Sequence, residues 1–328
     1  MLNPSPPDAF VERLRSVGRA LVTSHASPDG DAIGSQLGLA RLLRATGKSA
    51  TVWDAEPVPS IYTGLPGADR VRSGAEPPAG FPDAFDALIV VECPTLERTG
   101  LEATLAGKLP ILNFDHHLGN QVYGDVNWVD TAAPAAGEMV LQLSAALHVT
   151  LDADTATCLL MALVSDTGSF RFSNATRRAF EAAATLVDAG ASPEAVSQRL
   201  YESRPEASLR LQGEMLSTLA LHAGGRVATA TLTQEMYARS AADSSDAEGL
   251  IDQPRSIAGV DAVALLREIA GESVKVSLRS RGSSADVERI AKRHGGGGHR
   301  NAAGCRLSGE LEPVRQQIAN ELEEELKR

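Results

Sequence analysis

The chain has 328 residues, of which 43% are hydrophobic and 22% charged, a balance that excludes a disordered or fibrous protein. This length predicts two domains, each large enough to bury its own core. Lys and Arg number 31 against 42 Asp and Glu, for a net charge of −11, and aromatic residues make up only 4%. Such a chain is poorly suited to tracking a long nucleic-acid duplex or stacking many bases.

The sequence also bears on where the protein works. No apolar run reaches the roughly 18 to 20 residues that a membrane helix needs, and residues 1–18 carry prolines and acids where a signal peptide has a basic start and an apolar centre. Cys93, Cys158 and Cys305 are far apart and lack metal-ligand spacing, which predicts reduced thiols. We therefore expect a cytoplasmic protein with no membrane partner.

The first part of the chain alternates between strand and helix patterns. Short apolar runs at 19–25, 49–55, 85–93 and 109–117 predict strands, and the last two are continuously apolar, as in parallel strands buried on both faces. Helical patterns follow the first run as far as Gly47 and recur at 136–147, 154–164 and 176–189. This alternation predicts an α/β domain with a parallel sheet and helices on both of its faces.

The pattern changes after Gly190. Ser192-Pro193-Glu194 is a helix start, with proline at the first helical position, and the helix continues to about Tyr201. Strand-like runs at 226–234, 260–269 and 273–281 follow, then a short helix near 285–293, a glycine run and a charged final helix. We expect a first domain over 1–190, a helical linker over 191–210, and a smaller α/β domain over 211–328.

Polar residues of metal-binding types follow four apolar segments. They are His25 with Asp29 and Asp31, then Glu92, then Asp115-His116-His117, and finally Asp166. Each has a structural alternative: Asp29-Gly30-Asp31 could be a turn and a helix cap, Glu92 could cap the next helix, and Asp166 could be a turn residue. Four such clusters at corresponding ends are harder to explain structurally, because crowded carboxylates repel one another unless a cation neutralises them. Mixed imidazole and carboxylate ligands suit Mn²⁺, Zn²⁺ or Fe²⁺.

Taken together, these segments resemble a known family. The segment SHASPDGDAIGS (24–35), the acid at 92, DHH (115–117) and SDTG (165–168) resemble the four motifs of the DHH phosphoesterases. The stretch RHGGGGHRNAAG (293–304) resembles the signature of their DHH-associated C-terminal domain. The resemblance covers essentially the whole chain and implies a metal-binding DHH domain followed by a substrate-binding domain, with the active site in the cleft between them.

The resemblance also implies roles for individual residues. One Mn²⁺ would be bound by His25 and Asp29, a second by Asp31, His116 and Asp166, and Glu92 would bridge both, giving two ions per subunit. His117 would be catalytic beside the substrate phosphate, and Asp115 would orient a histidine. The family usually has aspartate at the bridging position, and the alternative is that Asp86 or Asp115 serves there while Glu92 is a surface acid.

The glycine run and a strand end predict a substrate-binding region. A lone run of glycines is usually a flexible loop, but with His294, His299 and Arg300 beside it the run resembles an anion-binding nest of backbone N–H groups. Residues 266–300 hold eight Lys or Arg against four Asp or Glu. We expect substrate contacts from Arg279, Ser280, Gly296, Gly297, Gly298 and His299, although arginines at a strand end can equally be solvated.

In the resembling family, two-domain chains of this length degrade very short oligoribonucleotides to 5'-mononucleotides and dephosphorylate 3'-phosphoadenosine 5'-phosphate. We expect this activity, with short oligoribonucleotides or nucleotide bisphosphates as partners. Hydrolysis of cyclic di-AMP or its linear product pApA is the nearest alternative, and a nucleotide-binding module with weak catalysis is an alternative of another class. The sequence decides neither the preferred substrate nor the oligomeric state, so a homodimer stays open.

Overall fold

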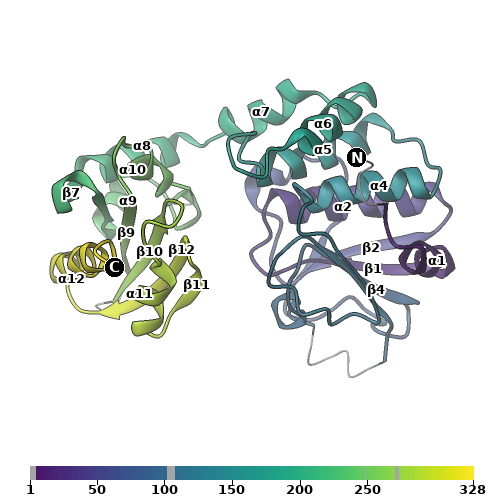
Figure 1. The fold of residues 1–328 in the computed structure, drawn as a ribbon, viewed down its shortest axis with the longest axis horizontal. Helices are drawn as coiled ribbons and strands as arrows, with labels where there is room; N and C mark the ends of the chain where they lie inside the picture. The colour runs from purple at the N-terminus through teal and green to yellow at the C-terminus, as the bar shows by residue number, and fades with distance from the viewer. Residues whose placement is uncertain (1–4, 102–107, 248, 270–272) are drawn as a thin grey trace. The chain divides into compact units, whose positions relative to one another are not determined.

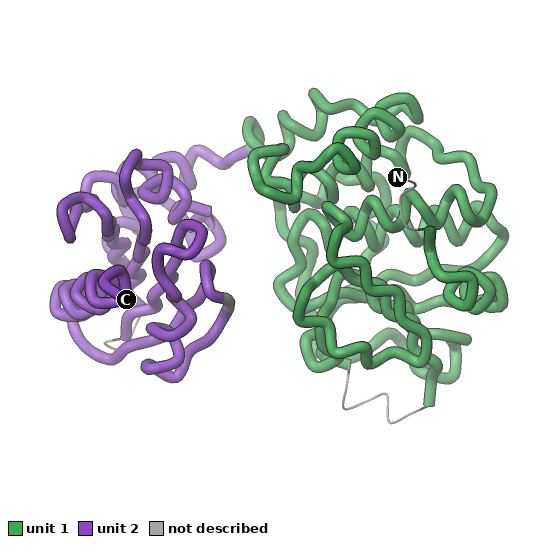
Figure 2. The backbone as a smooth tube through the Cα atoms, in the orientation of Figure 1, with its two compact units in different colours: residues 1–203 green, residues 204–328 purple. Residues whose placement is uncertain are grey.

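The computed structural model describes residues 5–101, 108–247, 249–269 and 273–328. The chain divides into two compact units, Met1–Ser203 and Arg204–Arg328 (Figure 2). Each unit has its own sheet and its own hydrophobic core. The expectation of two α/β domains, the first with a parallel sheet, is confirmed.

The first unit contains a parallel sheet of six strands (Figure 1). The strands are β1 (Arg19–Thr23), β2 (Ser49–Asp54), β3 (Arg72–Ser73), β4 (Ala87–Val91), β5 (Ile111–Asp115) and β6 (Val126–Val129), in the order β3-β2-β1-β4-β5-β6. Every neighbouring pair is parallel. The strand order reverses between β1 and β4, and such a switch point is where open α/β sheets bind ligands at the carboxyl ends of their strands.

Helices pack on one face of this sheet and form the larger core. They are α1 (Asp8–Ser16), α2 (Gly30–Ala45), α4 (Ala136–Ala146), α5 (Ala153–Asp166), α6 (Arg177–Asp188) and α7 (Pro193–Tyr201). Buried side chains from all six join those of the sheet in one hydrophobic cluster. Side-chain caps define two starts: Asp29 accepts hydrogen bonds at the start of α2, and Asp152 does so at the start of α5.

We expected helices on the other face of the sheet as well. In the described part of the chain it is covered by a smaller cluster that includes Trp53, Cys93, Leu101 and Leu109, with Phe81 against them. Two of the 3-10 helices of this unit, η1 (Ser60–Tyr62) and η2 (Ala68–Arg70), precede β3, and η3 (Leu96–Thr99) follows β4. Among the described residues, the segments 74–86 and 92–101 contribute to this cover, and the prolines and glycines between 74 and 86 do not favour a helix.

The second unit contains a mixed sheet. Its strands are β7 (Ala220–His222), β8 (Val227–Leu232), β9 (Ala262–Ile269), β10 (Ser273–Ser280), β11 (Gly297–His299) and β12 (Ala302–Ser308), in the order β11-β12-β10-β9-β8-β7. Of these described strands, only β8 and β9 pair in parallel. The helices are α8 (Glu206–Ser217), α9 (Gln234–Ser240), α10 (Asp252–Arg255), α11 (Val287–Arg293) and α12 (Leu311–Glu325), with η4 (Ala223–Gly225) and η5 (Ser245–Ala247).

The boundary between the units falls inside the segment that we expected to be a linker. Val196 of α7 is 1% exposed and belongs to the core of the first unit, whereas Leu211 and Met215 of α8 belong to a core of the second. The segment 191–210 is thus divided between the units at Ser203–Arg204. None of the helices in the described ranges is long and apolar enough to span a membrane.

Candidate metal centre

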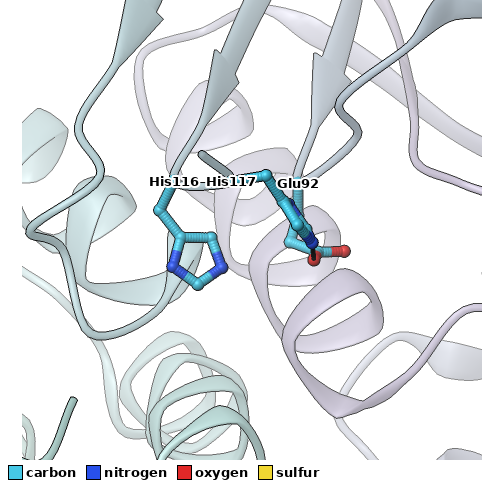
Figure 3. A group of neighbouring side chains, drawn as sticks. All are labelled: Glu92, His116 and His117. Carbon is cyan, nitrogen blue, oxygen red and sulfur yellow. Dashed lines mark ion pairs between the residues drawn. The ribbon is translucent and has the colours of Figure 1, made fainter. Parts of the chain in front are cut away.

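The predicted metal ligands meet at the carboxyl ends of three adjacent strands. Strand β1 is followed by His25, β4 by Glu92, and β5 by His116 and His117. The strand register explains why His25 and Glu92 lie beside each other. Thr23 pairs with Val90, and His25 and Glu92 each follow two residues later. Val91 likewise lies opposite Phe114, which places Glu92 beside the DHH segment (Figure 3).

Three groups of side chains have ligand atoms within 4.8 Å of one another. The groups are His25, Asp29 and Glu92; Asp31, His116 and Asp166; and Glu92, His116 and His117. The first two divide the residues as the family resemblance implies. The third contains Glu92 together with His116 of the second group, so Glu92 lies close to both.

Two histidines are oriented by backbone carbonyls. Nδ1 of His25 lies 2.8 Å from the carbonyl oxygen of Ala26, and Nδ1 of His116 lies 3.1 Å from that of Ala133. A carbonyl only accepts hydrogen bonds, so Nδ1 carries the proton in each ring and Nε2 is turned toward the carboxylates. Such a carbonyl partner is the usual companion of a histidine that binds metal through its other nitrogen.

Asp31 is held at the start of another helix. Its Oδ2 accepts a hydrogen bond from the N–H of Ala136 at 2.7 Å, and its Oδ1 accepts from Gly137 N at 3.0 Å and from the hydroxyl of Ser35 at 2.8 Å. Nε2 of His116 is 3.5 Å from Oδ2. Burial raises the pKa of Asp31 to about 7, with His116 opposing and Asp166 reinforcing the shift. A carboxyl with this pKa needs a cation beside it to be fully ionised at neutral pH.

Asp29 caps a helix, as the structural alternative predicted, and it also belongs to a ligand group. Its Oδ1 accepts hydrogen bonds from Asp31 N at 2.9 Å and from Ala32 N at 3.0 Å, which caps α2. The same carboxylate lies in the group with His25 and Glu92. The cap fixes the aspartate where α2 begins, so the two roles are compatible.

Close packing of α2 on α5 brings the two helix ends together. A Cβ atom at Gly30 would lie 2.5 Å from Oγ of Ser165, and one at Gly34 would lie 2.4 Å from the carbonyl oxygen of Cys158. Glycine at both positions therefore lets the helices approach more closely than any side chain would permit. As a result Asp31, in the first turn of α2, lies near Asp166, the last residue of α5.

Asp166 has a partner that sequence reasoning missed. Asn174 donates hydrogen bonds to Oδ2 of Asp166 at 3.0 Å and to the carbonyl oxygens of Asp166 and Pro134. Nε2 of His116 is 3.9 Å from the same Oδ2. The asparagine thereby holds the carboxylate toward His116. Its only signal in the sequence is a polar residue shortly after the SDTG motif.

Glu92 is the residue where this chain departs from the family pattern. Its φ is 53°, a left-handed conformation that is uncommon outside glycine, and its side chain is 3% exposed. Oε2 lies 2.6 Å from Nε2 of His25, and Oε1 lies 3.4 Å from Nε2 of His117. Burial, reinforced by Asp29 and Asp31, raises the pKa of Glu92 well above its usual range. The left-handed turn after β4 thus holds the Glu92 carboxylate between two histidines.

The surroundings of Glu92 fit a bound cation. Oε2 is buried, and none of the described residues makes a hydrogen bond to it, although His25 approaches closely. Because Nδ1 of His25 donates to the Ala26 carbonyl, Nε2 is the ring nitrogen that faces this carboxyl oxygen. An imidazole nitrogen and a carboxylate oxygen turned toward each other can bind one cation, and nitrogen with oxygen ligands suits Mn²⁺ or Zn²⁺.

Asp115 and His117 form a pair at the end of β5. Oδ1 of Asp115 accepts hydrogen bonds from Nδ1 of His117 at 2.8 Å and from the backbone N–H of His116 at 2.8 Å. Although burial opposes it, this bonding lowers the pKa of Asp115. The carboxylate therefore stays ionised and orients His117, whose ring is only partly buried.

A further acid, missed from sequence, ends β2 at the same edge. Asp54 is fully buried and accepts hydrogen bonds from Ser24 N at 3.1 Å and from Nε2 of Gln36 at 2.6 Å. Burial raises its pKa to about 6. Asp54 belongs to none of the three ligand groups. It instead holds Ser24, the residue before His25.

The predicted substrate residues lie in the second unit, and the structure gives several of them local roles. Ser280 is 5% exposed; its hydroxyl donates to the carbonyl of Ala285 and accepts from Asn301. Arg279 donates to the carbonyl of Leu278, and burial lowers its pKa. Their part in substrate binding stays a prediction.

The glycine run is partly a strand rather than a loop. Gly297 and Gly298 belong to β11, which pairs with Gly304 and Ala303 of β12. A Cβ atom at Gly296 would lie 2.1 Å from the carbonyl oxygen of Gly304, so close strand packing requires a glycine there. The His299 side chain lies outside the part of the chain that the structure describes.

Comparison with known proteins bears on both units. Residues 19–163 match the model of the DHH family, N-terminal domain, and residues 224–328 match the DHHA1 domain. A bifunctional oligoribonuclease and PAP phosphatase, NrnA, from Thermus thermophilus is 36% identical over 335 residues, covering 99% of this chain and 98% of that protein. The NrnA of Bacillus subtilis is 27% identical, covering 86% of this chain and 87% of its own.

A solved structure has the same architecture throughout. The exopolyphosphatase-related protein from Bacteroides fragilis superposes with a TM-score of 0.91 at 25% identity, covering 100% of both chains. Both the fold of each unit and the order of the two units along the chain are therefore shared with a known protein.

Proposed function

Because this chain belongs to the DHH family of phosphoesterases, we propose that it hydrolyses very short oligoribonucleotides to 5'-mononucleotides and removes the 3'-phosphate from 3'-phosphoadenosine 5'-phosphate. It is a hydrolase by family membership, and the substrates are those named for its NrnA relatives. The observation that carries the proposal is the convergence of six histidine, aspartate and glutamate side chains at the sheet's switch point. These side chains are His25, Asp29, Asp31, Glu92, His116 and Asp166.

The donor set fits two divalent cations, for which we propose Mn²⁺. His25 and Asp29 would hold one, Asp31, His116 and Asp166 the other, and Glu92 would contact both. When bound, such a pair neutralises phosphoryl oxygens and supplies a water nucleophile at neutral pH. The carbonyl partners of His25 and His116 keep the correct ring nitrogen available for the cations.

His117 would act on the substrate itself. Its Nδ1–H is held by the ionised carboxylate of Asp115 at 2.8 Å, so Nε2 is directed toward the centre. In that position His117 can hold a proton for the oxygen that leaves phosphorus. Asp115 would stabilise the charged ring without touching the substrate.

The second unit would supply the remaining substrate contacts. Arg279 and the glycines at 296–298 are the residues that we propose for the far phosphate or the base, together with His299. The Ser280 hydroxyl already hydrogen-bonds to Ala285 and Asn301. We therefore propose that Ser280 contacts the substrate through its backbone and not through its side chain.

A turnover assay with purified full-length protein tests the function. We would measure release of 5'-mononucleotide from a dinucleotide, phosphate from 3'-phosphoadenosine 5'-phosphate, and products from cyclic di-AMP and pApA, each with Mn²⁺ and with a chelator. Hydrolysis of the first two, lost on chelation and restored by Mn²⁺, is expected. Preference for cyclic di-AMP or pApA would reassign the substrate, and binding without turnover would indicate a nucleotide-binding module.

We also propose a cytoplasmic location. Cys93, Cys158 and Cys305 are buried thiols with no disulfide, and burial raises the pKa of Cys93 and Cys158 to about 12. Unreactive thiols and the absence of disulfides are typical of a reducing compartment.

A further inference from the structure

A buried polar cluster lies beside the metal centre and is used by none of the roles described above. Asn113 lies in the middle of β5 between Leu112 and Phe114 and is 0% exposed. An amide buried in a strand is costly unless its hydrogen bonds are made within the protein. Both the amide nitrogen and the amide oxygen of Asn113 therefore require protein partners.

Asn113 is connected to two other side chains. Its Nδ2 donates to the hydroxyl of Tyr123 at 3.0 Å, and its Oδ1 accepts from Nδ2 of Asn120 at 2.9 Å. The Tyr123 hydroxyl in turn donates to the carbonyl oxygen of Cys93 at 2.9 Å. We call Asn113, Asn120 and Tyr123 the Asn113 network. In each of these contacts an N–H or O–H group donates and an oxygen atom accepts.

One end of the Asn113 network fixes the backbone beside Glu92. The Cys93 carbonyl that Tyr123 binds belongs to the residue directly after Glu92. On the preceding side, the hydroxyl of Ser24 donates to the carbonyl of Val91 at 2.7 Å. Glu92 has a φ of 53°, a conformation that persists only where surrounding contacts enforce it. Tyr123 and Ser24 supply such contacts on both sides of Glu92.

The other end of the network fixes Asp115. Nδ2 of Asn120 donates to Oδ2 of Asp115 at 2.7 Å, while Oδ1 of the same carboxylate holds Nδ1 of His117 at 2.8 Å. Nε2 of His117 then lies 3.4 Å from Oε1 of Glu92. The contacts form a closed ring that runs from Glu92 through Cys93 and the network to Asp115, His117 and back.

We propose that Asn113, Asn120 and Tyr123 are positioning residues that set the Glu92 carboxylate relative to His117. This proposal rests on the proposed function, because it assumes that these two side chains serve a metal-dependent centre. In this proposal the Asn113 network contacts neither a cation nor the substrate. Its effect would be to keep the strained Glu92 turn and the Asp115–His117 pair in one fixed relation while substrate binds and leaves.

The first experiment compares Tyr123→Phe with the unchanged full-length protein. The substitution removes one hydroxyl and keeps the ring, so the fold should be retained. We expect Mn²⁺ to bind about 10-fold more weakly, as measured by calorimetry or electron paramagnetic resonance, which is the scale for losing an outer partner of a metal site. We also expect kcat to fall by about the same factor, with KM little changed.

Two control variants separate positioning from general stability. Tyr237→Phe removes a hydroxyl from the half-buried tyrosine of α9 in the second unit and should leave Mn²⁺ affinity unchanged. Val196→Ala destabilises the core of the first unit through α7, away from the network. If Val196→Ala weakened Mn²⁺ binding as much as Tyr123→Phe at matched thermal stability, the network would be structural only.

Asn120→Ala provides an independent variant and a test of coupling. Because Asn120 and Tyr123 act through the same ring of contacts, the double variant should lose less Mn²⁺ affinity than the product of the two single losses. Unchanged Mn²⁺ affinity in both folded single variants would overturn the proposal. An unchanged protein that binds Mn²⁺ but hydrolyses none of the tested substrates would instead count against the proposed function alone.

Discussion

Nε2 of His25 lies 2.6 Å from Oε2 of Glu92, so the ends of β1 and β4 meet at a buried histidine–carboxylate pair. These strands are neighbours on either side of the point where the strand order reverses. The pair brings together residues 67 positions apart in the chain, as the Ser24 hydrogen bond to Val91 does one residue earlier. A substitution that disturbs either strand end should therefore change the arrangement of side chains throughout the centre.

The first prediction concerns Glu92 itself. Glu92→Gln keeps the size of the side chain and removes its charge, so a carboxylate near both ligand groups is lost. We expect kcat to fall by about 100-fold and Mn²⁺ to bind more weakly, the scale for disrupting a metal-site interaction. Steady-state kinetics and metal titration would measure both.

Glu92→Asp is the matched comparison, because it restores the residue that the family usually has at this position. It should retain metal and change the rate or the preferred metal. Near-normal turnover and full metal content in Glu92→Gln would show that the bridging assignment is wrong and would favour another acid.

The second prediction concerns the packing of α2 on α5. In Gly34→Ala the new Cβ would lie 2.4 Å from the Cys158 carbonyl oxygen and 2.9 Å from the Ala162 nitrogen, both backbone atoms. The helices must separate, so we expect a loss of about 1–3 kcal/mol in the free energy of unfolding. Mn²⁺ affinity should also fall, because Asp31 and Asp166 move apart.

Gly213→Ala is the control for this variant. Gly213 lies in α8 of the second unit, and a Cβ atom added there would meet no described atom outside its own helix within 4 Å. Alanine should therefore be neutral or stabilising by up to about 1 kcal/mol. Denaturant unfolding would measure both variants. Equal stability and equal Mn²⁺ affinity for Gly34→Ala would contradict the close-packing argument.

The third prediction is the pH dependence of the metal-free protein. Burial raises the pKa of Asp31 from 3.8 to about 7. Burial opposes the shift at His116, but the carboxylates of Asp31, Asp166 and Glu92 outweigh it and raise the pKa of His116 from 6.5 to about 9. Both groups therefore bind more protons folded than unfolded, Asp31 between pH 4 and 7 and His116 between pH 6.5 and 9. The free energy of unfolding should fall as pH rises through this window.

Urea denaturation of chelator-treated protein at several pH values would measure this slope. In Asp31→Asn the slope below neutral pH should become shallower without disappearing, because burial also raises the pKa values of Asp54, Glu92 and Asp166. Mn²⁺ affinity should change in the opposite direction and rise with pH, because binding requires deprotonated ligands. A wild-type stability that rises with pH more steeply than that of Asp31→Asn would contradict the prediction.

The fourth prediction is selectivity for short substrates. Aromatic residues make up 4% of the chain and the net charge is −11, so few bases can stack and few phosphates can be held at once. We expect kcat/KM to fall steeply once RNA exceeds about five nucleotides. Equal values for a dinucleotide and an oligomer of roughly 24 nucleotides would indicate a processive exonuclease.

The sequence by itself indicated strands β1, β2, β4 and β5 of the first unit and the residue types at its centre, but not α1, β3 or β6. The continuous apolar runs before Glu92 and before Asp115 became β4 and β5, since residues that can be buried on both faces specify inner parallel strands. The clusters after them lie at the shared carboxyl edge because strand direction follows from the parallel arrangement. His25, Asp29, Asp31, Glu92, His116 and Asp166 are therefore brought together as the motifs indicated.

Only the tertiary structure decided how these side chains are held. Three features depend on contacts that form only when the chain folds. They are the left-handed φ of Glu92, the Asn174 contact with Asp166, and the Tyr123 hydrogen bond to Cys93. The glycine run shows the same limit, because backbone pairing with β12 and not local flexibility placed Gly297 in a strand. Local sequence specifies which residues can bind a cation, whereas packing and hydrogen bonds between distant segments fix where their ligand atoms point.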